Sequence, residues 1–209
     1  MKKHLILLGA PGSGKGTQSS KLKEAGWVHV STGDLLRAEI SKKSELGLKV
    51  KSVMDAGQLV TDEQVVELLK ANLDLKNNKY IFDGYPRNHK QAKTLDGILK
   101  GHDYVAVYFK LNLDILIERI TNRRTTKNGK NIYNLKTNPP KVEGICDVTG
   151  EALIQRDDDK EDVVRERMNV FEATIDPILD FFNNNNHLVV IDADQDLDQV
   201  YNQILNKIE

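Results

Sequence analysis

The sequence has little cysteine, no long apolar run and almost no net charge, and each shortage excludes a class of protein. A single cysteine in 209 residues excludes an internal disulfide framework and suits a reducing compartment. The apolar run in "MKKHLILLG" is too short for a signal-peptide core or a membrane span. Thirty basic residues balance thirty-one acidic ones, so nothing draws the whole chain toward nucleic acid or anionic lipid. We therefore expect a globular cytoplasmic protein that binds neither nucleic acid nor membrane, and a monomer, because no long exposed apolar stripe calls for a partner.

Short apolar runs are what the chain does have, and they predict strands. Each run is continuous rather than alternating, which is typical of strands buried on both faces of a parallel sheet. The runs occupy residues 5–8, 27–30, 80–82, 104–109 and 188–191. Helical patterns separate them, so the sequence predicts an α/β fold with a five-stranded parallel sheet and helices on both faces. In such folds ligands bind beyond the carboxyl ends of the strands.

Two of the helical patterns are especially clear. Thr61 and Gln64 form a capping-box pattern that is followed by an apolar face beginning at Val65. An amphipathic pattern from Leu197 to Ile208 predicts a final helix.

Two stretches interrupt the alternation of strands and helices. Residues 31–57 read as two successive helices, and residues 122–159 show no helical period and are rich in Gly, Asn, Thr, Pro and Lys. A structureless loop of that length is unusual inside a compact domain, so we expect a small insertion of short strands and turns. The predicted organisation is a core of residues 1–30, 61–121 and 160–209 with two inserted covers, residues 31–60 and a lid at 122–159.

The strongest motif is "LILLGAPGSGKGT", in which a strand leads into a glycine-rich loop, a lysine and a helix. Glycines allow successive backbone N–H groups to point at phosphate oxygens, and the helix N-terminus adds a partial positive charge. The preceding strand and the lysine argue against a chance glycine turn. The motif departs from the general phosphate loop because Gly16 follows Lys15, where most such enzymes place a hydroxyl on Mg²⁺. Here the hydroxyl comes one residue later, at Thr17.

Arginines and one aspartate complete the chemistry that the residues themselves indicate. Phosphoryl transfer depends on positioning and on neutralising charge, and bidentate guanidinium groups suit phosphate oxygens. Candidate arginines border the predicted covers and strand ends. Asp83 ends a buried strand, where a carboxylate can hold Mg²⁺ through water, although a turn or N-cap aspartate is the alternative. Asp158 and Asp159 could act similarly or pair with lid lysines.

Five segments together carry a family resemblance. "GAPGSGKGT", "STGDLLR", "DAGQLVTDE", "DGYPRNHKQA" and "QRDDD" with "VRERM" follow one another along nearly the whole chain. In this order they resemble the nucleoside monophosphate kinases, and the adenylate kinase family of the long-lid bacterial type in particular. The fourth segment, "DGYPRNHKQA", differs from the usual family signature by Tyr85 in place of Phe. The resemblance implies a phosphate-loop NTPase-like fold and Mg²⁺-dependent reversible transfer of a phosphoryl group from ATP to AMP, giving two ADP.

The resemblance also implies a role for each matching residue. The residues expected to act in catalysis are Lys15, Arg87, Arg123, Arg156 and Arg167. Those expected to bind ATP are Gly12, Ser13, Gly14, Lys15, Gly16, Thr17, Arg119, Arg123, Ile132, Tyr133 and Gln195. Those expected to bind AMP are Thr32, Arg37, Gln58, Leu59, Val60, Gly84, Tyr85, Pro86, Arg87, Gln91, Arg156 and Arg167. Asp83 is expected to hold Mg²⁺ through water.

Two other functions remain open at this stage. A kinase for UMP, CMP or GMP is the nearest, although the long insertion at 122–159 disfavours the pyrimidine enzymes, whose lids are usually short. Thr32 and Gln91 resemble the adenine-selecting pattern. A nucleotide-binding switch that hydrolyses ATP slowly is the other, but it needs no second base pocket and no cluster of arginines aimed at an acceptor.

The lone cysteine lies in "VEGICDVTGEAL", within the predicted lid. No histidine lies near Cys146 in sequence, and phosphoryl transfer needs no thiol nucleophile. Many long-lid relatives hold structural zinc with four lid cysteines, and the matching positions here are Thr126, Gly129, Cys146 and Thr149. One thiolate is too few ligands for zinc, so we expect no structural zinc. We expect Thr126, Thr149 and Asp147 to hold the lid, with Cys146 as a small filler.

Overall fold

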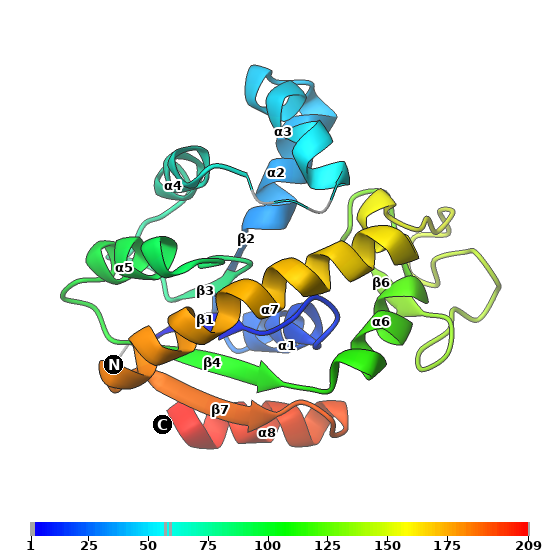
Figure 1. Ribbon diagram of the computed structural model, residues 1–209. Coiled ribbons are helices and arrows are strands. Elements are labelled where there is room, and N and C mark those ends of the chain that lie inside the picture. Colours follow the sequence, from blue (N-terminus) through cyan, green and yellow to red (C-terminus); the bar gives the residue numbers. More distant parts are fainter. Residues whose placement is uncertain (1–2, 57, 59, 209) are drawn as a thin grey trace.

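The computed structural model describes residues 3–56, 58 and 60–208, and it contains the predicted parallel sheet (Figure 1). The strand order is β2-β3-β1-β4-β7, with every neighbouring pair parallel. The strands are β1 (His4–Leu8), β2 (Val28–Ser31), β3 (Tyr80–Asp83), β4 (Tyr104–Lys110) and β7 (Leu188–Asp192). The expected fold class is therefore confirmed.

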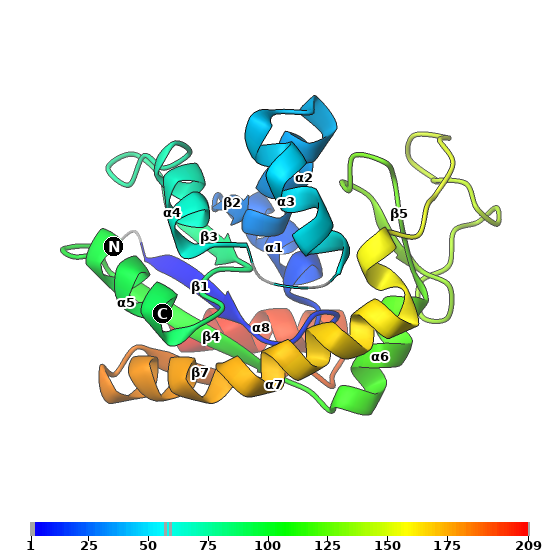
Figure 2. The same cartoon turned by 45° about the horizontal axis from the view of Figure 1, so that its top comes forward.

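Both faces of the sheet are covered, which explains why the strands read as continuous apolar runs. Ile6 and Leu8 of β1 pack on one face with helices α4 (Asp62–Lys70), α5 (His89–Ile98) and α7 (Glu161–Asn184). Leu5 and Leu7 pack on the other face with α1 (Lys15–Glu24) and α8 (Leu197–Ile208). Figure 2 shows α7 running along one side of the sheet and α8 lying on the other.

The strand register gathers the chemically important segments at one edge. Asp83 pairs with Leu7 of β1 and with Ser31 of β2, so the ends of these three strands lie side by side. The glycine-rich loop leaves β1 at this edge. Helix α6 (Leu113–Thr121) packs near it, because Leu116 and Ile120 share a buried cluster with Ala10 and with α7.

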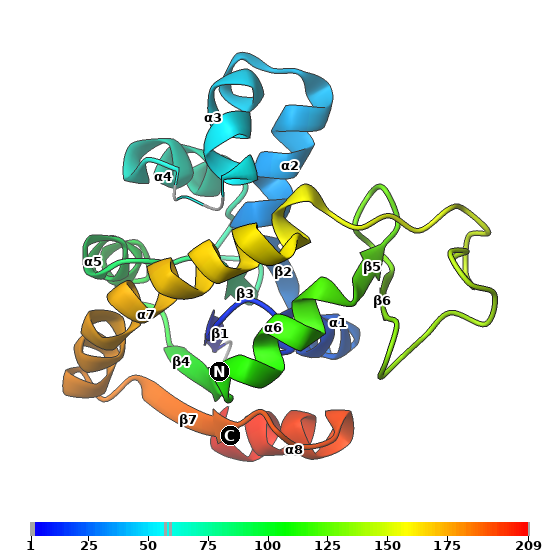
Figure 3. The ribbon, with the colours of Figure 1, turned by 45° about the vertical axis from the view of Figure 1, so that its right-hand side comes forward.

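The two interruptions in the alternation have the local structure that the sequence predicts. Helices α2 (Thr32–Lys42) and α3 (Glu45–Asp55) follow β2 with no strand between them. Strands β5 (Arg123–Thr125) and β6 (Ile132–Asn134) form an antiparallel pair, extended by bridges from Thr125 to Ile154 and from Ile145 to Ala152. A 3-10 turn, η1 (Asp157–Asp159), leads into α7. Figure 3 shows the α2–α3 pair and the β5–β6 segment on neighbouring sides of the molecule.

One local prediction is wrong in detail. Helix α4 does begin after Thr61, but the Thr61 hydroxyl bonds the Gln64 side-chain oxygen at 2.9 Å and caps no backbone N–H. The two side chains of the expected capping box therefore satisfy each other rather than the helix end. No helix in the described part of the chain combines the length and apolar character needed to cross a bilayer.

Candidate active site

The phosphate loop holds its shape through its own lysine. Gly9, Gly12 and Gly14 all have positive φ, and a Cβ at Gly12 would lie 2.6 Å from Ile120 of α6. Lys15 folds back over the loop, where its ammonium donates hydrogen bonds to the carbonyl oxygens of Gly9 (2.7 Å) and Ala10 (2.8 Å). The loop is thus ordered, with its lysine facing the concave side where a phosphate would lie.

The charge of Lys15 is destabilised by its surroundings. Burial, joined by the positive charges of Arg87, Arg167 and Arg123, lowers the pKa of its ammonium to about 8 against the opposing effect of Asp83. Three of the arginines predicted to be catalytic therefore act on the lysine of the loop, although they come from distant parts of the sequence. Such a crowd of cations favours a polyanionic ligand.

Asp83 lies beside this group of cations and is held by a residue that the sequence analysis missed. The ring of His29, on β2, lies 3.2 Å from the Asp83 carboxylate. Burial alone would raise the pKa of Asp83, but the bond to His29 and the charge of Lys15 outweigh it and lower the pKa, so the carboxylate is ionised at neutral pH. The signal was available, because a partly buried histidine between two valines of a strand needs a polar partner.

Two arginines are anchored by the acidic turn η1. Arg123 makes a bidentate pair with the fully buried Asp159, at 2.8 and 2.5 Å. Arg167 of α7 bonds Asp158 at 2.9 Å and Asp159 at 3.4 Å. Of the two alternatives for these aspartates, pairing with lid lysines is not what the structure shows, because α7 and β5 bring arginines to them instead.

Three further arginines lie around the same cleft. Arg37 bonds Asp34 at 2.5 Å and approaches Asp158 at 4.0 Å. Arg87 donates from Nε to the Gly84 carbonyl at 2.7 Å. Burial, followed by repulsion from Arg37 and Arg123, lowers the pKa of Arg156 to about 10. The five cations predicted to be catalytic are thus linked by contacts or by mutual charge effects.

The residues expected to bind the second nucleotide surround the turn after β3. The Thr32 hydroxyl donates to the Gly84 carbonyl at 2.8 Å, and a Cβ at Gly84 would lie 2.9 Å from that hydroxyl. Tyr85 and Pro86 are buried, and Gln91 is 2% exposed.

Of the residues expected to bind AMP at the end of the first cover, Gln58 to Val60, the two that the structure describes differ in their surroundings. Gln58 bonds Glu166 of α7, so its amide is engaged away from the turn after β3. Val60 is half-buried, and Leu59 lies outside the described residues.

The residues expected around ATP divide into two groups. Arg119 lies 3.6 Å from Asp194, and the exposed Gln195 bonds Asp192 at 3.4 Å, both near the start of α8. On the lid, Ile132 reaches over the phosphate loop, since a Cβ at Gly16 would lie 4.0 Å from its Cδ1. Tyr133 instead turns its side chain into the lid interior, where it is buried.

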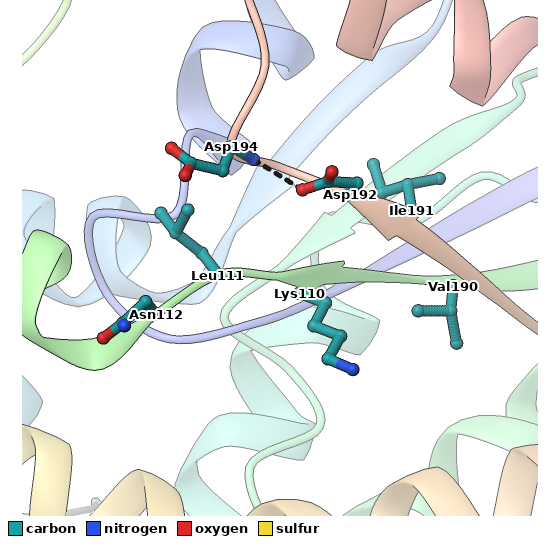
Figure 4. Close-up of a pocket in the computed structure, with 7 residues that line it drawn as sticks. All are labelled: Lys110, Leu111, Asn112, Val190, Ile191, Asp192 and Asp194. Carbon is teal, nitrogen blue, oxygen red and sulfur yellow. Dashed lines mark hydrogen bonds between the residues drawn. The ribbon is translucent and has the colours of Figure 1, made fainter.

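A hollow of about 580 Å³ lies at the ends of β4 and β7, close to Arg119 (Figure 4). Its walls include Asp194, the partner of Arg119, together with Lys110 and Val190. None of the residues predicted to bind phosphate lines it. The hollow is therefore adjacent to the cationic cleft and is not itself the phosphate site.

The lid interior is organised around Tyr133, which the sequence analysis assigned to ATP. Its hydroxyl accepts a hydrogen bond from the Asp147 N–H at 2.8 Å and lies 3.6 Å from the buried Cys146 sulfur. Thr126, which was expected to hold the lid together with Thr149 and Asp147, bonds Asn128 and Asn131 and forms a separate turn. Burial would raise the pKa of the Cys146 thiol, but hydrogen bonds from Thr149, Tyr133 and the local backbone lower it to about 7.

Metal-ligating side chains are sparse. Within the described residues no group of three or more His, Cys, Asp or Glu side chains is placed to hold a metal ion. Any cation at Asp83 would need most of its ligands from substrate phosphates and water, which is how Mg²⁺ is commonly held in kinases.

Comparison with known proteins agrees with this geometry. The profile of the family described as "Adenylate kinase" matches residues 7–187. The adenylate kinase of Thermosipho melanesiensis is 45% identical over 211 residues, which cover 98% of this chain and 99% of the relative. Adenylate kinases of Clostridium novyi (41% over 211 residues, 98% of each chain) and Shouchella clausii (43% over 208 residues, 96% and 95%) are also similar.

Proposed function

This chain belongs to the adenylate kinase family, and on that premise we propose that it transfers a phosphoryl group reversibly from ATP to AMP, giving two ADP. The observation that carries the proposal is the convergence of Arg87, Arg123 and Arg167 on Lys15, seen in their combined effect on its pKa. A cluster of cations beside a phosphate loop supports a reaction in which negative charge must be stabilised on two sets of phosphates.

The phosphate loop would hold the phosphates of ATP. Its N–H groups and the start of α1 would bind phosphate oxygens, and Lys15 would leave the carbonyl oxygens of Gly9 and Ala10 to meet them. Arg119 and the backbone near Gln195 would contact the base, and Ile132 would cover it from the lid. Tyr133 would contribute by shaping the lid, since its hydroxyl is occupied by Asp147.

AMP would lie on the opposite side of the cleft. Arg37 and Arg87 would bind its phosphate, and Thr32, Val60 and Gln91 would surround its adenine, with the turn from Gly84 to Pro86 forming the floor. Gln58 and Leu59 belong to the same proposed pocket. Arg123, Arg156 and Arg167 would lie between the nucleotides, at the group in transfer. In-line geometry and the arginines then supply the catalysis, because no nucleophile or cofactor-bound intermediate is required.

The proposed cofactor is Mg²⁺ bound with ATP, and Asp83 fits it. The carboxylate is ionised, lies beside the phosphate loop and can hold a cation through water. Bound there, the ion would neutralise phosphate charge during transfer. His29 would keep the carboxylate oriented toward the cleft.

The two inserted segments, residues 31–60 and 122–159, are proposed to act as covers over the two nucleotides. Closing them would expel water that could otherwise accept the phosphoryl group. Arg156 supports this proposal, because Asp34 of the first cover acts on its charge and a Cβ at Gly129 of the lid would lie 3.1 Å from its guanidinium. The enzyme is proposed to work as a cytoplasmic monomer.

The decisive experiment offers ATP with AMP, CMP, UMP or GMP in parallel, with and without Mg²⁺, and measures diphosphate formation. We expect rapid ADP production that depends on both AMP and Mg²⁺. Preference for another monophosphate would assign the chain to a different acceptor. Phosphate release from ATP without any acceptor requirement would indicate an ATP-hydrolysing switch and overturn the proposal.

A further inference from the structure

The side-chain amide of Gln91 is fixed at one end by the backbone of Arg87 and at the other by Asp62, which lies outside the predicted site. Its oxygen accepts a hydrogen bond from the Arg87 backbone N–H at 2.6 Å, and its nitrogen donates to Asp62 at 2.7 Å. Asp62 is the first residue of α4 and also accepts from Asn88 at 3.0 Å. Gln91 itself is 2% exposed, so water cannot easily replace either partner.

These two partners dictate which way the amide points. A backbone N–H can only donate, and an ionised carboxylate can only accept, so exchanging the oxygen and nitrogen of Gln91 would oppose like groups at both ends. Asp62 is ionised at neutral pH: its partial burial would raise its pKa, but bonds from Asn88 and Gln91 and the charge of Lys90 lower it. The orientation of the amide therefore follows from its chemistry.

Half of the hydrogen-bonding capacity of Gln91 remains for a ligand. A glutamine amide has two N–H donors and two acceptor lone pairs, and the protein uses one of each. The remaining donor and acceptor match the base edge of adenine, which offers a ring nitrogen acceptor beside an amino donor. Hypoxanthine and guanine present a carbonyl acceptor and an N–H donor, the reverse arrangement.

We propose that Asp62 is a positioning residue that sets base selectivity, by holding the Gln91 amide in the direction that reads adenine. This inference rests on the proposed function, in which Gln91 faces the base of AMP. Asp62 does not touch the nucleotide in this account. Its role is to make the reversed amide unfavourable, so that a base with the opposite pattern meets mismatched groups.

Two simpler roles for Asp62 make different predictions. If the carboxylate only stabilised the start of α4, its removal would weaken AMP and IMP binding equally. If it acted through its negative charge, its removal would strengthen the binding of both anionic nucleotides. Only the positioning role changes the ratio of the two affinities.

The test is calorimetric titration of the full chain with AMP and with IMP, which share ribose and phosphate and differ in the base edge. We expect Asp62→Ala to reduce the AMP-to-IMP affinity ratio at least tenfold, with the KM for AMP raised and kcat at saturating AMP little changed. Asp62→Asn keeps an oxygen that can accept from both Gln91 and Asn88, and we expect it to preserve most of the ratio.

Glu63→Ala is the matched control. Glu63 follows Asp62 in α4 and pairs with the same lysine, Lys90, at 3.2 Å, so its loss removes the same charge from the same helix end. We expect it to leave the affinity ratio unchanged. Should Asp62→Ala fail to fold, Asp62→Ser carries the same prediction, because a hydroxyl both donates and accepts and so imposes no direction.

The outcomes separate this inference from the function on which it rests. A wild-type chain that does not prefer AMP to IMP refutes the proposed acceptor, and the role of Asp62 with it. A wild-type preference that survives intact in Asp62→Ala and Asp62→Ser refutes the role of Asp62 alone. An equal change in both affinities supports one of the two simpler roles and also overturns the inference.

Discussion

The group of cations around Lys15 and the lid interior are both polar, yet they are built on opposite principles. This group concentrates cations, and their burial, followed by mutual repulsion, lowers the pKa of Lys15 to about 8 and that of Arg156 to about 10. The lid interior joins Tyr133, Cys146 and Asp147 through hydrogen bonds that satisfy one another. The first group concentrates positive charge, whereas the three lid residues bond one another.

Within the cleft, the same contrast separates two kinds of arginine. Arg123 and Arg167 are neutralised by Asp158 and Asp159, while Arg87 forms no salt bridge within the described part of the chain. A paired buried arginine supports the fold, and an unpaired one is available to a substrate. Substitutions should therefore separate effects on turnover from effects on stability.

The largest expected effect is on turnover, from Arg87→Ala. We expect turnover to fall by about three orders of magnitude, because a group that binds charge on the transferred phosphoryl or its acceptor is lost. The free energy of unfolding should stay within about 1 kcal/mol of wild type, since the side chain is largely exposed and unpaired. Steady-state kinetics and urea denaturation measure the two quantities.

Lys90→Ala is the control for Arg87→Ala, because it removes a nearby cation whose ion pairs are at the surface. It should leave turnover within a few-fold of wild type. Near-normal turnover in Arg87→Ala would show that this arginine is wrongly placed in the site.

Arg123→Ala should add a large loss of stability to its loss of turnover. The substitution leaves the carboxylate of Asp159 buried, with only the 3.4 Å contact to Arg167. We expect the free energy of unfolding to fall by about 2–4 kcal/mol in urea denaturation. Arg165→Ala breaks an exposed ion pair with Glu161, one turn away on α7, and should lower the free energy of unfolding by less than about 0.5 kcal/mol. Equal losses in the two variants would contradict the distinction.

The pH dependence of ATP use should report Lys15. In the free enzyme the ammonium has a pKa of about 8, and only its protonated form attracts phosphate. We expect kcat/KM for ATP to decline above pH 8, approaching about tenfold per pH unit. Lys15→Arg, which stays charged, should move the decline to higher pH even though it lowers turnover. A wild-type profile that is flat to well above pH 9 would disprove this assignment.

Tyr133→Phe should weaken the hydrogen bonding inside the lid while keeping the aromatic ring that fills it. The variant leaves the Asp147 N–H without its acceptor and removes one hydrogen bond that lowers the pKa of Cys146. We expect the free energy of unfolding to fall by about 1 kcal/mol and the thiol pKa to rise above the wild-type value of about 7. The thiol pKa is measured from the ultraviolet absorbance of the single thiolate. Tyr201→Phe, on α8, should leave the thiol pKa unchanged. A downward shift in Tyr133→Phe would contradict the described contact.

The smallest expected effect is a gain in stability from Tyr85→Phe. The Tyr85 hydroxyl is buried with no partner at ordinary hydrogen-bonding distance, only a weak interaction with Thr94, and burial raises its pKa to about 12. Removing it should stabilise the fold by about 0.5–1 kcal/mol in thermal or urea unfolding. Tyr80→Phe is the contrast, because its hydroxyl accepts from the Asp74 N–H at 2.7 Å, and it should destabilise. Destabilisation by Tyr85→Phe would reveal a partner for that hydroxyl.

The sequence was most informative where a local pattern determines the structure. Continuous apolar runs predicted all five strands of the sheet, because strands buried on both faces leave no position for polar residues. The phosphate loop was equally clear, since its glycines and Lys15 are adjacent in the chain. The grouping of distant arginines came from family resemblance.

Contacts that depend on register or on packing between distant segments were not predictable. The pairing of His29 with Asp83 requires the β2–β3 register, and the bond from Gln58 to Glu166 requires the position of α7. Tyr133 was assigned to ATP because nothing in its neighbourhood shows that β6 turns its side chain inward. The capping box at Thr61 had the right residues, yet the two side chains bonded each other.

The glycine after Lys15, which departs from the general phosphate loop, has a steric meaning once the lid is in place. Ile132 lies close enough that even a methyl group at position 16 would be in van der Waals contact with it. A larger side chain there would fill the space between the lid and the loop. The absence of a side chain at Gly16 therefore leaves room for Ile132 of the lid beside the phosphate loop.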